Sequence, residues 1–175
     1  SEVMPMSVKF SFKLINLKSS IANDEIIVIP ANTKRFLVAK ITPVNAREGN
    51  QFSYTTTFNF GNAAQETFDE DYLYSLPFGK GKTHLIYQGY YGKFSHQKDA
   101  ALDFDMKIGD PVYAAREGTV VLTEDSNLQG CPKISCAKFN NKVLIMHSDG
   151  TFADYAHLKY KGVAVKKGDE IKKGQ

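Results

Sequence analysis

The stretch from Lys142 to His157, KVLIMHSDGTFADYAH, places a turn signal between two runs of strand-forming residues. Asp149 and Gly150 both tolerate the positive φ of a type I′ turn, so this pair predicts a two-residue hairpin loop. The flanking residues 142–147 and 151–157 are expected to be the two strands of the hairpin. The pattern therefore indicates that this half of the chain is built from β-hairpins.

Short strand-like runs separated by turn residues continue on both sides of this hairpin. We expect further strands in this half at residues 83–88, 101–105, 111–115, 118–122 and 163–165. Lys107 to Val112 and Lys167 to Ile171 each place a glycine turn before a strand. Such an internal echo is typical of a small β barrel assembled from a duplicated half-motif.

The first half of the chain also has β periodicity. Residues 7–14 alternate polar and apolar side chains, which predicts a strand with one buried face. Strands at 25–29, 35–42 and 52–60 would complete a small β-sandwich. The segment from Pro77 to Lys82 has the composition of a linker. We therefore predict an all-β protein with a β-sandwich-like domain at residues 1–78 and a second domain, built from β-hairpins, at residues 79–175.

Composition and charge exclude several classes of protein. The 175 residues carry a net charge of +3, which is too weak and too scattered to indicate nucleic-acid binding. No apolar run approaches the roughly 18 residues that cross a bilayer, so no transmembrane segment is predicted. Nothing in the sequence specifies the oligomeric state.

The two cysteines, Cys131 and Cys136, bracket a polar segment. A disulfide between them is sterically allowed and would imply an oxidising compartment such as a periplasm or the cell exterior. Free thiols are the alternative. Half of a metal site is a third possibility, but no second pair of Cys or His lies nearby at ligand spacing.

Two parts of the chain could carry metal chemistry. His96 is followed seven positions later by Asp103, which the alternation in 101–105 places on one face with Asp105. In the predicted hairpin, Tyr155 and His157 would share a face, whereas His147 would lie near the tip. Taken alone, these residues are more often a surface histidine, a solvated acidic face and half-buried packing, and His84 has only this ordinary interpretation.

A set of short segments favours the metal site over these ordinary roles. They are QGYYGKFSH at 88–96, ALDF at 101–104, GDPVYAA at 109–115 leading into GTV at 118–120, HSDGT at 147–151 and YAHL at 155–158. Their order resembles that of lysostaphin-type (LytM-like) zinc metallopeptidases over about residues 85–175. Each segment alone is weak, but the combination is specific. Members of that family cut peptides of bacterial peptidoglycan, and their fold is a β barrel-sandwich hybrid with a groove.

The resemblance implies a role for particular residues. It makes His96 and Asp103 the first two ligands of a Zn²⁺ ion, although their spacing is longer than the His-x-x-x-Asp of lysostaphin itself. His157 would be the histidine that stabilises the tetrahedral intermediate without binding zinc. Tyr90 or Tyr91 would assist at the oxyanion, and the sequence does not decide between them. His147 is given no catalytic role.

The family pattern continues with a His-x-His segment that supplies the third zinc ligand and the general base. The sequence ends at Gln175 without that segment. We therefore expect an incomplete barrel that binds zinc weakly or not at all and is inactive. Loss of a C-terminal piece is the favoured explanation, with a naturally shortened homologue as the alternative.

Two other functions compete with an extracytoplasmic bacterial zinc endopeptidase. A non-catalytic homologue could bind peptidoglycan or a partner enzyme through the same groove. A biotinyl or lipoyl carrier has a similar glycine-turn pattern near its end, and Met106-Lys107 is the nearest match to its modified lysine. However, the segments at 95–104 and 155–158 have no place in a carrier.

Overall fold

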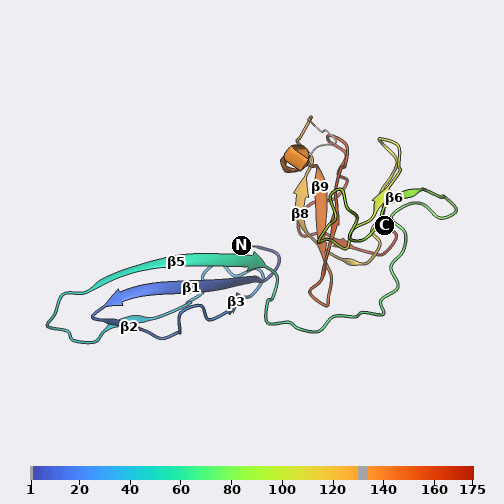
Figure 1. Ribbon diagram of the computed structural model, residues 1–175. Helices are drawn as coiled ribbons and strands as arrows, with labels where there is room; N and C mark the ends of the chain where they lie inside the picture. The colour runs from blue at the N-terminus through green and yellow to red at the C-terminus, as the bar shows by residue number, and fades with distance from the viewer. Residues whose placement is uncertain (1, 130–133) are drawn as a thin grey trace. The chain divides into compact units, whose positions relative to one another are not determined.

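The computed structural model describes residues 2–129 and 134–175. It is nearly all β, which confirms the predicted fold class (Figure 1). The chain divides into two compact units, Ser1–Phe68 and Asp69–Gln175. Residues 69–78, which we expected to precede the domain boundary, are therefore grouped with the second unit. Backbone hydrogen bonds from Ser75 to Ala115 and from Tyr113 to Pro77 tie this segment to that unit.

The first unit is organised around two long antiparallel strands, β1 (Met6–Ile15) and β5 (Gln51–Phe60). They pair continuously from Met6 opposite Phe60 to Ile15 opposite Gln51. The short strand β3 (Ile27–Ile29) pairs with the other edge of β1, which gives the order β3-β1-β5 (Figure 1). A separate two-stranded sheet joins β2 (Leu17–Ser19) to β4 (Ile41–Pro43).

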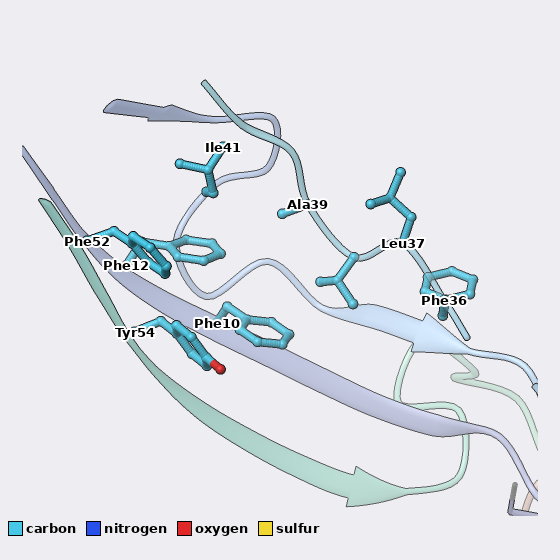
Figure 2. A pocket seen from close by; sticks show the side chains of 9 residues that line it. Phe10, Phe12, Phe36, Leu37, Ala39, Ile41, Phe52 and Tyr54 are labelled. Atoms are coloured by element: carbon cyan, nitrogen blue, oxygen red, sulfur yellow. The ribbon is translucent and has the colours of Figure 1, made fainter. Parts of the chain in front are cut away.

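The strand predicted at 7–14 forms, but its alternation is only partly as predicted: Lys9 and Lys13 are exposed and Phe10 and Phe12 half-buried, whereas Ser7 is buried. The aromatic side chains of β1 and β5 line an apolar hollow of about 320 Å³ that residues 36–41 partly cover (Figure 2). The strand predicted at 35–42 shortens to β4. One reason is that the backbone N–H of Lys40 donates to the Ser20 hydroxyl instead of to a neighbouring strand.

The second unit contains a four-stranded antiparallel sheet in the order β10-β9-β8-β11. Its strands are β8 (Gly118–Glu124), β9 (Lys142–Met146), β10 (Phe152–Tyr155) and β11 (Glu170–Ile171). Five buried apolar residues form the core, and four partly buried ones pack against them: Ala114, Val120, Val143, Ile145 and Ile171, with Tyr155, Leu158, Val163 and Val165. Among the described residues the sheet does not close into a barrel.

Two smaller elements complete the second unit. Strands β6 (Ile86–Gln88) and β7 (Asp103–Phe104) form a two-stranded antiparallel sheet of their own. A 3₁₀ helix, η1 (Ile134–Phe139), follows β8. The strands predicted at 111–115 and 163–165 do not form. Val163 and Val165 nevertheless pack on the core, so their apolar pattern reflects burial rather than strand pairing.

The hairpin at 142–157 forms, but its loop is one residue longer than predicted. Met146 lies opposite Phe152, and the backbone N–H of His147 donates to Thr151 at 2.8 Å. Gly150 has positive φ and Asp149 does not. The loop is thus a three-residue turn with glycine at the left-handed position, not a type I′ turn. His147 lies next to this loop and is buried on the same face of its strand as Val143 and Ile145.

The internal echo is visible as repeated local geometry. In the first copy, the N–H of Lys107 donates to the Asp110 carboxylate and the Asp110 N–H donates to the Lys107 carbonyl. Lys166 and Asp169 make the same two bonds in the second copy. Gly109 and Gly168 have φ of 97° and 96°, respectively. Left-handed backbone favours glycine here, which explains why the motif keeps glycine before the aspartate.

Candidate active site

The two predicted metal ligands lie side by side in the second unit. His96 follows the turn after β6, and Asp103 is the first residue of β7. The His96 Nε2 and Asp103 Oδ1 atoms are 3.4 Å apart, and the two side chains are 12% and 22% exposed. The structure therefore brings an imidazole nitrogen and a carboxylate oxygen together at a partly buried position that solvent still reaches.

This separation fits two ligands of one tetrahedral metal ion. Zinc binds imidazole nitrogen and carboxylate oxygen at about 2.0–2.1 Å, so two tetrahedral ligand atoms lie about 3.3 Å apart. The observed distance matches that value. The donor set, one nitrogen and one oxygen, is also a set that zinc accepts.

Each of these side chains is oriented by a second group. His96 Nδ1 faces the Gly89 carbonyl oxygen at 3.4 Å. This long contact favours the tautomer with the proton on Nδ1, in which the lone pair on Nε2 is free to bind a metal ion. The Gln88 Nε2 donates to Asp103 Oδ2 at 3.0 Å and to Ser95 Oγ at 2.7 Å. Sequence reasoning quoted the segment 88–96 but assigned no role to Gln88 or Gly89.

His157 lies outside β10 rather than within a strand. Its φ of 61° is left-handed, which ends the strand at Tyr155. As a result Tyr155 and Leu158 both pack on the core while His157 is exposed, so the expected sharing of a face by Tyr155 and His157 is wrong. Within the described part of the chain, the His157 side chain makes no hydrogen bond or ion pair, which leaves both ring nitrogens open to solvent or substrate.

Tyr90 and Tyr91 are both exposed in the turn between β6 and His96. The backbone of Tyr91 is left-handed, with φ of 57°, and its N–H donates to the Asp99 carbonyl at 3.0 Å. This bond closes the loop that carries His96 toward β7. Neither hydroxyl is hydrogen-bonded to a described residue, so the choice between them stays open.

The other two histidines have structural environments. His147 is 1% exposed, and its Nδ1 lies 2.7 Å from the Glu117 carbonyl oxygen. Burial, together with the nearby positive charge of Arg116, lowers the pKa of His147 and so favours the neutral ring. His84 Nδ1 contacts the Asp105 carbonyl oxygen at 2.9 Å, and its ring packs against Phe78.

A buried arginine, which sequence reasoning did not single out, organises the surroundings of His147. Arg116 is 3% exposed, donates to Asp149 at 2.8 Å and to the Tyr74 hydroxyl at 3.2 Å, and lies 4.0 Å from the centre of the Tyr72 ring. Burial alone would raise the pKa of Asp149, but hydrogen bonds from Thr151 and Arg116 outweigh it and hold that pKa well below its usual value. The cluster attaches residues 72–74 to the hairpin loop.

The structure does not test the predicted disulfide. Cys131, one partner of the predicted disulfide with Cys136, is outside the described residues. Within residues 2–129 and 134–175, no cluster of three or more His, Cys, Asp or Glu side chains could hold a metal ion. The same residues contain no helix that is both long and apolar enough to span a bilayer.

Comparison with known proteins relates the second half of the chain to a peptidase family. The model of peptidase family M23 matches residues 97–175, beginning directly after His96 and including Asp103 and His157. The peptidoglycan DD-endopeptidase ShyA of Vibrio cholerae serotype O1 is 36% identical over 73 residues. That alignment covers 42% of this chain and 14% of ShyA, so the chain spans only a small part of the length of this relative. No solved structure matches significantly. The resemblance to lysostaphin-type (LytM-like) peptidases is thus confirmed for residues 97–175, which match the model of peptidase family M23.

Proposed function

We propose that this protein is a zinc metalloendopeptidase that hydrolyses peptide bonds in bacterial peptidoglycan, with His96 and Asp103 as zinc ligands. The observation that carries the proposal is the 3.4 Å separation between His96 Nε2 and Asp103 Oδ1, which suits two ligands of one zinc ion. The name of ShyA, a peptidoglycan DD-endopeptidase, supports the substrate class. A cell-wall substrate also implies that the protein works outside the cytoplasm.

Each proposed site residue would have a separate role in peptide hydrolysis. Bound zinc would supply a Lewis acid that activates water and polarises the scissile carbonyl. His157, with both ring nitrogens open, would donate a hydrogen bond to the oxyanion as it develops. One such donor contributes on the order of 3 kcal/mol to transition-state stabilisation. Tyr90, exposed next to the Gly89 carbonyl that faces His96, is the proposed second donor.

The 175 residues alone are proposed to be inactive. His96 and Asp103 are the two ligands found among the described residues, whereas a catalytic zinc site takes three protein ligands. A third ligand and a general base would have to come from outside the described residues. Zinc binding to this chain should accordingly be weak.

The test uses the full-length gene product and purified peptidoglycan. Zinc content is measured by elemental analysis, and released muropeptides are separated by chromatography. We expect bound zinc and new muropeptides from the wild type, and neither from His96→Ala or Asp103→Ala. Asp105→Ala is the matched control, because Asp105 is an exposed carboxylate two residues away and lies outside the ligand pair.

The alternative, a non-catalytic homologue that binds peptidoglycan, predicts a different result. In that case the full-length protein would sediment with peptidoglycan but release nothing. Loss of zinc would also leave its binding unchanged. Muropeptide release that survives in both His96→Ala and Asp103→Ala would refute the assignment of the ligands.

A further inference from the structure

We infer that Gln88 is the positioning residue that holds both proposed zinc ligands in their binding geometry, an inference that rests on the proposed function. The side chain of Gln88 reaches both chain segments that carry the ligands. Its amide nitrogen donates to Asp103 itself and to Ser95, the residue before His96.

The polarity of these bonds is fixed by chemistry. An ionised carboxylate only accepts hydrogen bonds, so Gln88 must present its NH₂ group, not its carbonyl oxygen, to Asp103. The amide has two protons, and the second is used by the Ser95 hydroxyl oxygen at 2.7 Å. With Oδ2 held by Gln88, the remaining oxygen Oδ1 is the one that faces His96 Nε2. Gln88 thus selects which carboxylate oxygen is offered to the metal.

A bulge in the sheet places Gln88 where it can do this. Ile86 pairs with Phe104, so a regular antiparallel ladder would set Tyr87 opposite Asp103. Instead Gln88 is opposite Asp103, because the register shifts between Ile86 and Gln88. A bulge of this kind adds one residue to one strand and re-aims the following side chain. The irregularity brings the glutamine to the same position on the sheet as the aspartate.

Gly92 supplies the space that this arrangement needs. A Cβ added at Gly92 would lie 2.5 Å from Gln88 Cγ, 3.0 Å from Gln88 Cδ and 3.0 Å from the Gly89 carbonyl oxygen. They belong to the two groups that contact the ligands, namely the Gln88 side chain, whose Nε2 bonds Asp103, and the Gly89 carbonyl, which faces His96. The φ of Gly92 is not in the left-handed region, so glycine is required there for room and not for backbone conformation. The turn from Gln88 to Gly92 therefore leaves room for the two groups that contact the ligands, the Gln88 side chain and the Gly89 carbonyl.

The central test replaces Gln88 by methionine, which keeps the length of the side chain and removes both donors. The zinc dissociation constant of the full-length gene product is measured by competition with a chromophoric chelator. Loss of a residue that hydrogen-bonds to a metal ligand weakens metal binding by about 10- to 100-fold. The Gln88→Met variant should therefore bind zinc at least about tenfold more weakly than the wild type. Gln97→Met is the matched control, since Gln97 donates from the same loop to the Lys93 carbonyl and touches neither ligand.

Two companion variants grade the effect. Ser95→Ala removes one of the two acceptors of Gln88 and leaves the Asp103 bond, so its loss of affinity should be smaller. Gly92→Ala removes no donor but pushes on Gln88, so it should weaken zinc binding as Gln88→Met does. The zinc affinity of each variant is compared with that of the control only if the two proteins have the same melting temperature. Should Gln88→Met fail to fold, Ser95→Ala and Gly92→Ala decide the question.

A crystal structure of the zinc-free Gln88→Met variant separates this inference from the proposed function. If Gln88 positions the ligands, the distance from His96 Nε2 to Asp103 Oδ1 changes from 3.4 Å whether or not the wild type binds zinc. A wild type that binds no zinc would refute the proposed function while leaving this distance to test Gln88. Wild-type zinc affinity in Gln88→Met, with the ligand pair undisturbed, would overturn the inference.

Discussion

Replacing Arg116 by methionine should destabilise the second unit by about 3 kcal/mol. Arg116 is 3% exposed and pairs with Asp149 at 2.8 Å. Removing one partner of a buried ion pair costs about 3–5 kcal/mol, because the other charge is left in a poorly solvated site. Asp149 would keep its hydrogen bonds from the Thr151 N–H and hydroxyl, and its side chain is 14% exposed. These two facts place the expected loss at the low end of that range.

The loss should be measurable by urea unfolding. Domains of this size unfold with about 5–15 kcal/mol, so 3 kcal/mol is about a fifth to three fifths of the total. At an m-value of about 2 kcal/mol/M, the midpoint falls by about 1.5 M with m unchanged. Tyrosine near-UV circular dichroism reports mainly the second unit, because Tyr54 is the only tyrosine in residues 1–68.

A matched control uses an exposed pair in the same sheet. Lys142 contacts Asp154 at 3.0 Å, but the two side chains are 35% and 44% exposed. Lys142→Met should therefore cost less than about 1 kcal/mol. If Arg116→Met is no more destabilising than Lys142→Met, the view that the buried arginine holds residues 72–74 on the hairpin loop is wrong.

The pH dependence provides a second check on Arg116. The pKa of Asp149 in the folded protein is below its unfolded value, so its contribution to stability is complete above about pH 4. That contribution is lost progressively as the pH falls below about 4 toward the folded pKa. The Arg116→Met variant should show a smaller loss of stability over this interval than the wild type. An identical acid dependence in both proteins would contradict the assignment.

Three further predictions concern packing and the site. Gly118→Ala should lower the unfolding free energy by at least about 1–3 kcal/mol, because its Cβ would lie 2.4 Å from the Met146 carbonyl oxygen, whereas Gly49→Ala meets no atom within 4 Å and should show no such loss in urea unfolding. Tyr155→Phe should cost about 1–3 kcal/mol in the same assay, because it removes the acceptor of the Ala115 N–H at 2.7 Å. In calorimetric titrations this chain should bind Zn²⁺ weakly, because His96 and Asp103 are the two candidate ligands found among the described residues; an affinity typical of a three-ligand zinc site would mean that two ligands suffice.

The sequence predicted the hairpin but not its register. Asp149-Gly150 correctly marked the turn between β9 and β10, since glycine is needed at the left-handed position. The length of the loop depends on Asp149, whose carboxylate bonds the Thr151 N–H and hydroxyl and also pairs with Arg116. The last contact joins residues far apart in the chain. Local turn preferences carry no information about this contact, and so they could not predict the one-residue difference in loop length.

In the candidate site, too, local patterns predicted only part of the structure. Residue types alone made His96 and Asp103 an ordinary histidine and carboxylate, and the family resemblance paired them. Their closeness depends on the loop between β6 and β7, which the bond from Tyr91 to Asp99 closes. Gln88 was not predicted because its role depends on a register shift that no local pattern encodes. The alternation rule also failed at His157, where left-handed backbone ended the strand.

Zinc stoichiometry in the full-length gene product tests whether His96 and Asp103 hold a zinc ion. The protein is saturated with Zn²⁺, dialysed against metal-free buffer and assayed by elemental analysis, in parallel with His96→Ala, Asp103→Ala and the control Asp105→Ala. The account predicts one zinc per chain in the wild type and the control, and zinc lost from both ligand variants. One zinc per chain retained in His96→Ala and Asp103→Ala would show that these side chains do not hold the metal and would contradict the account.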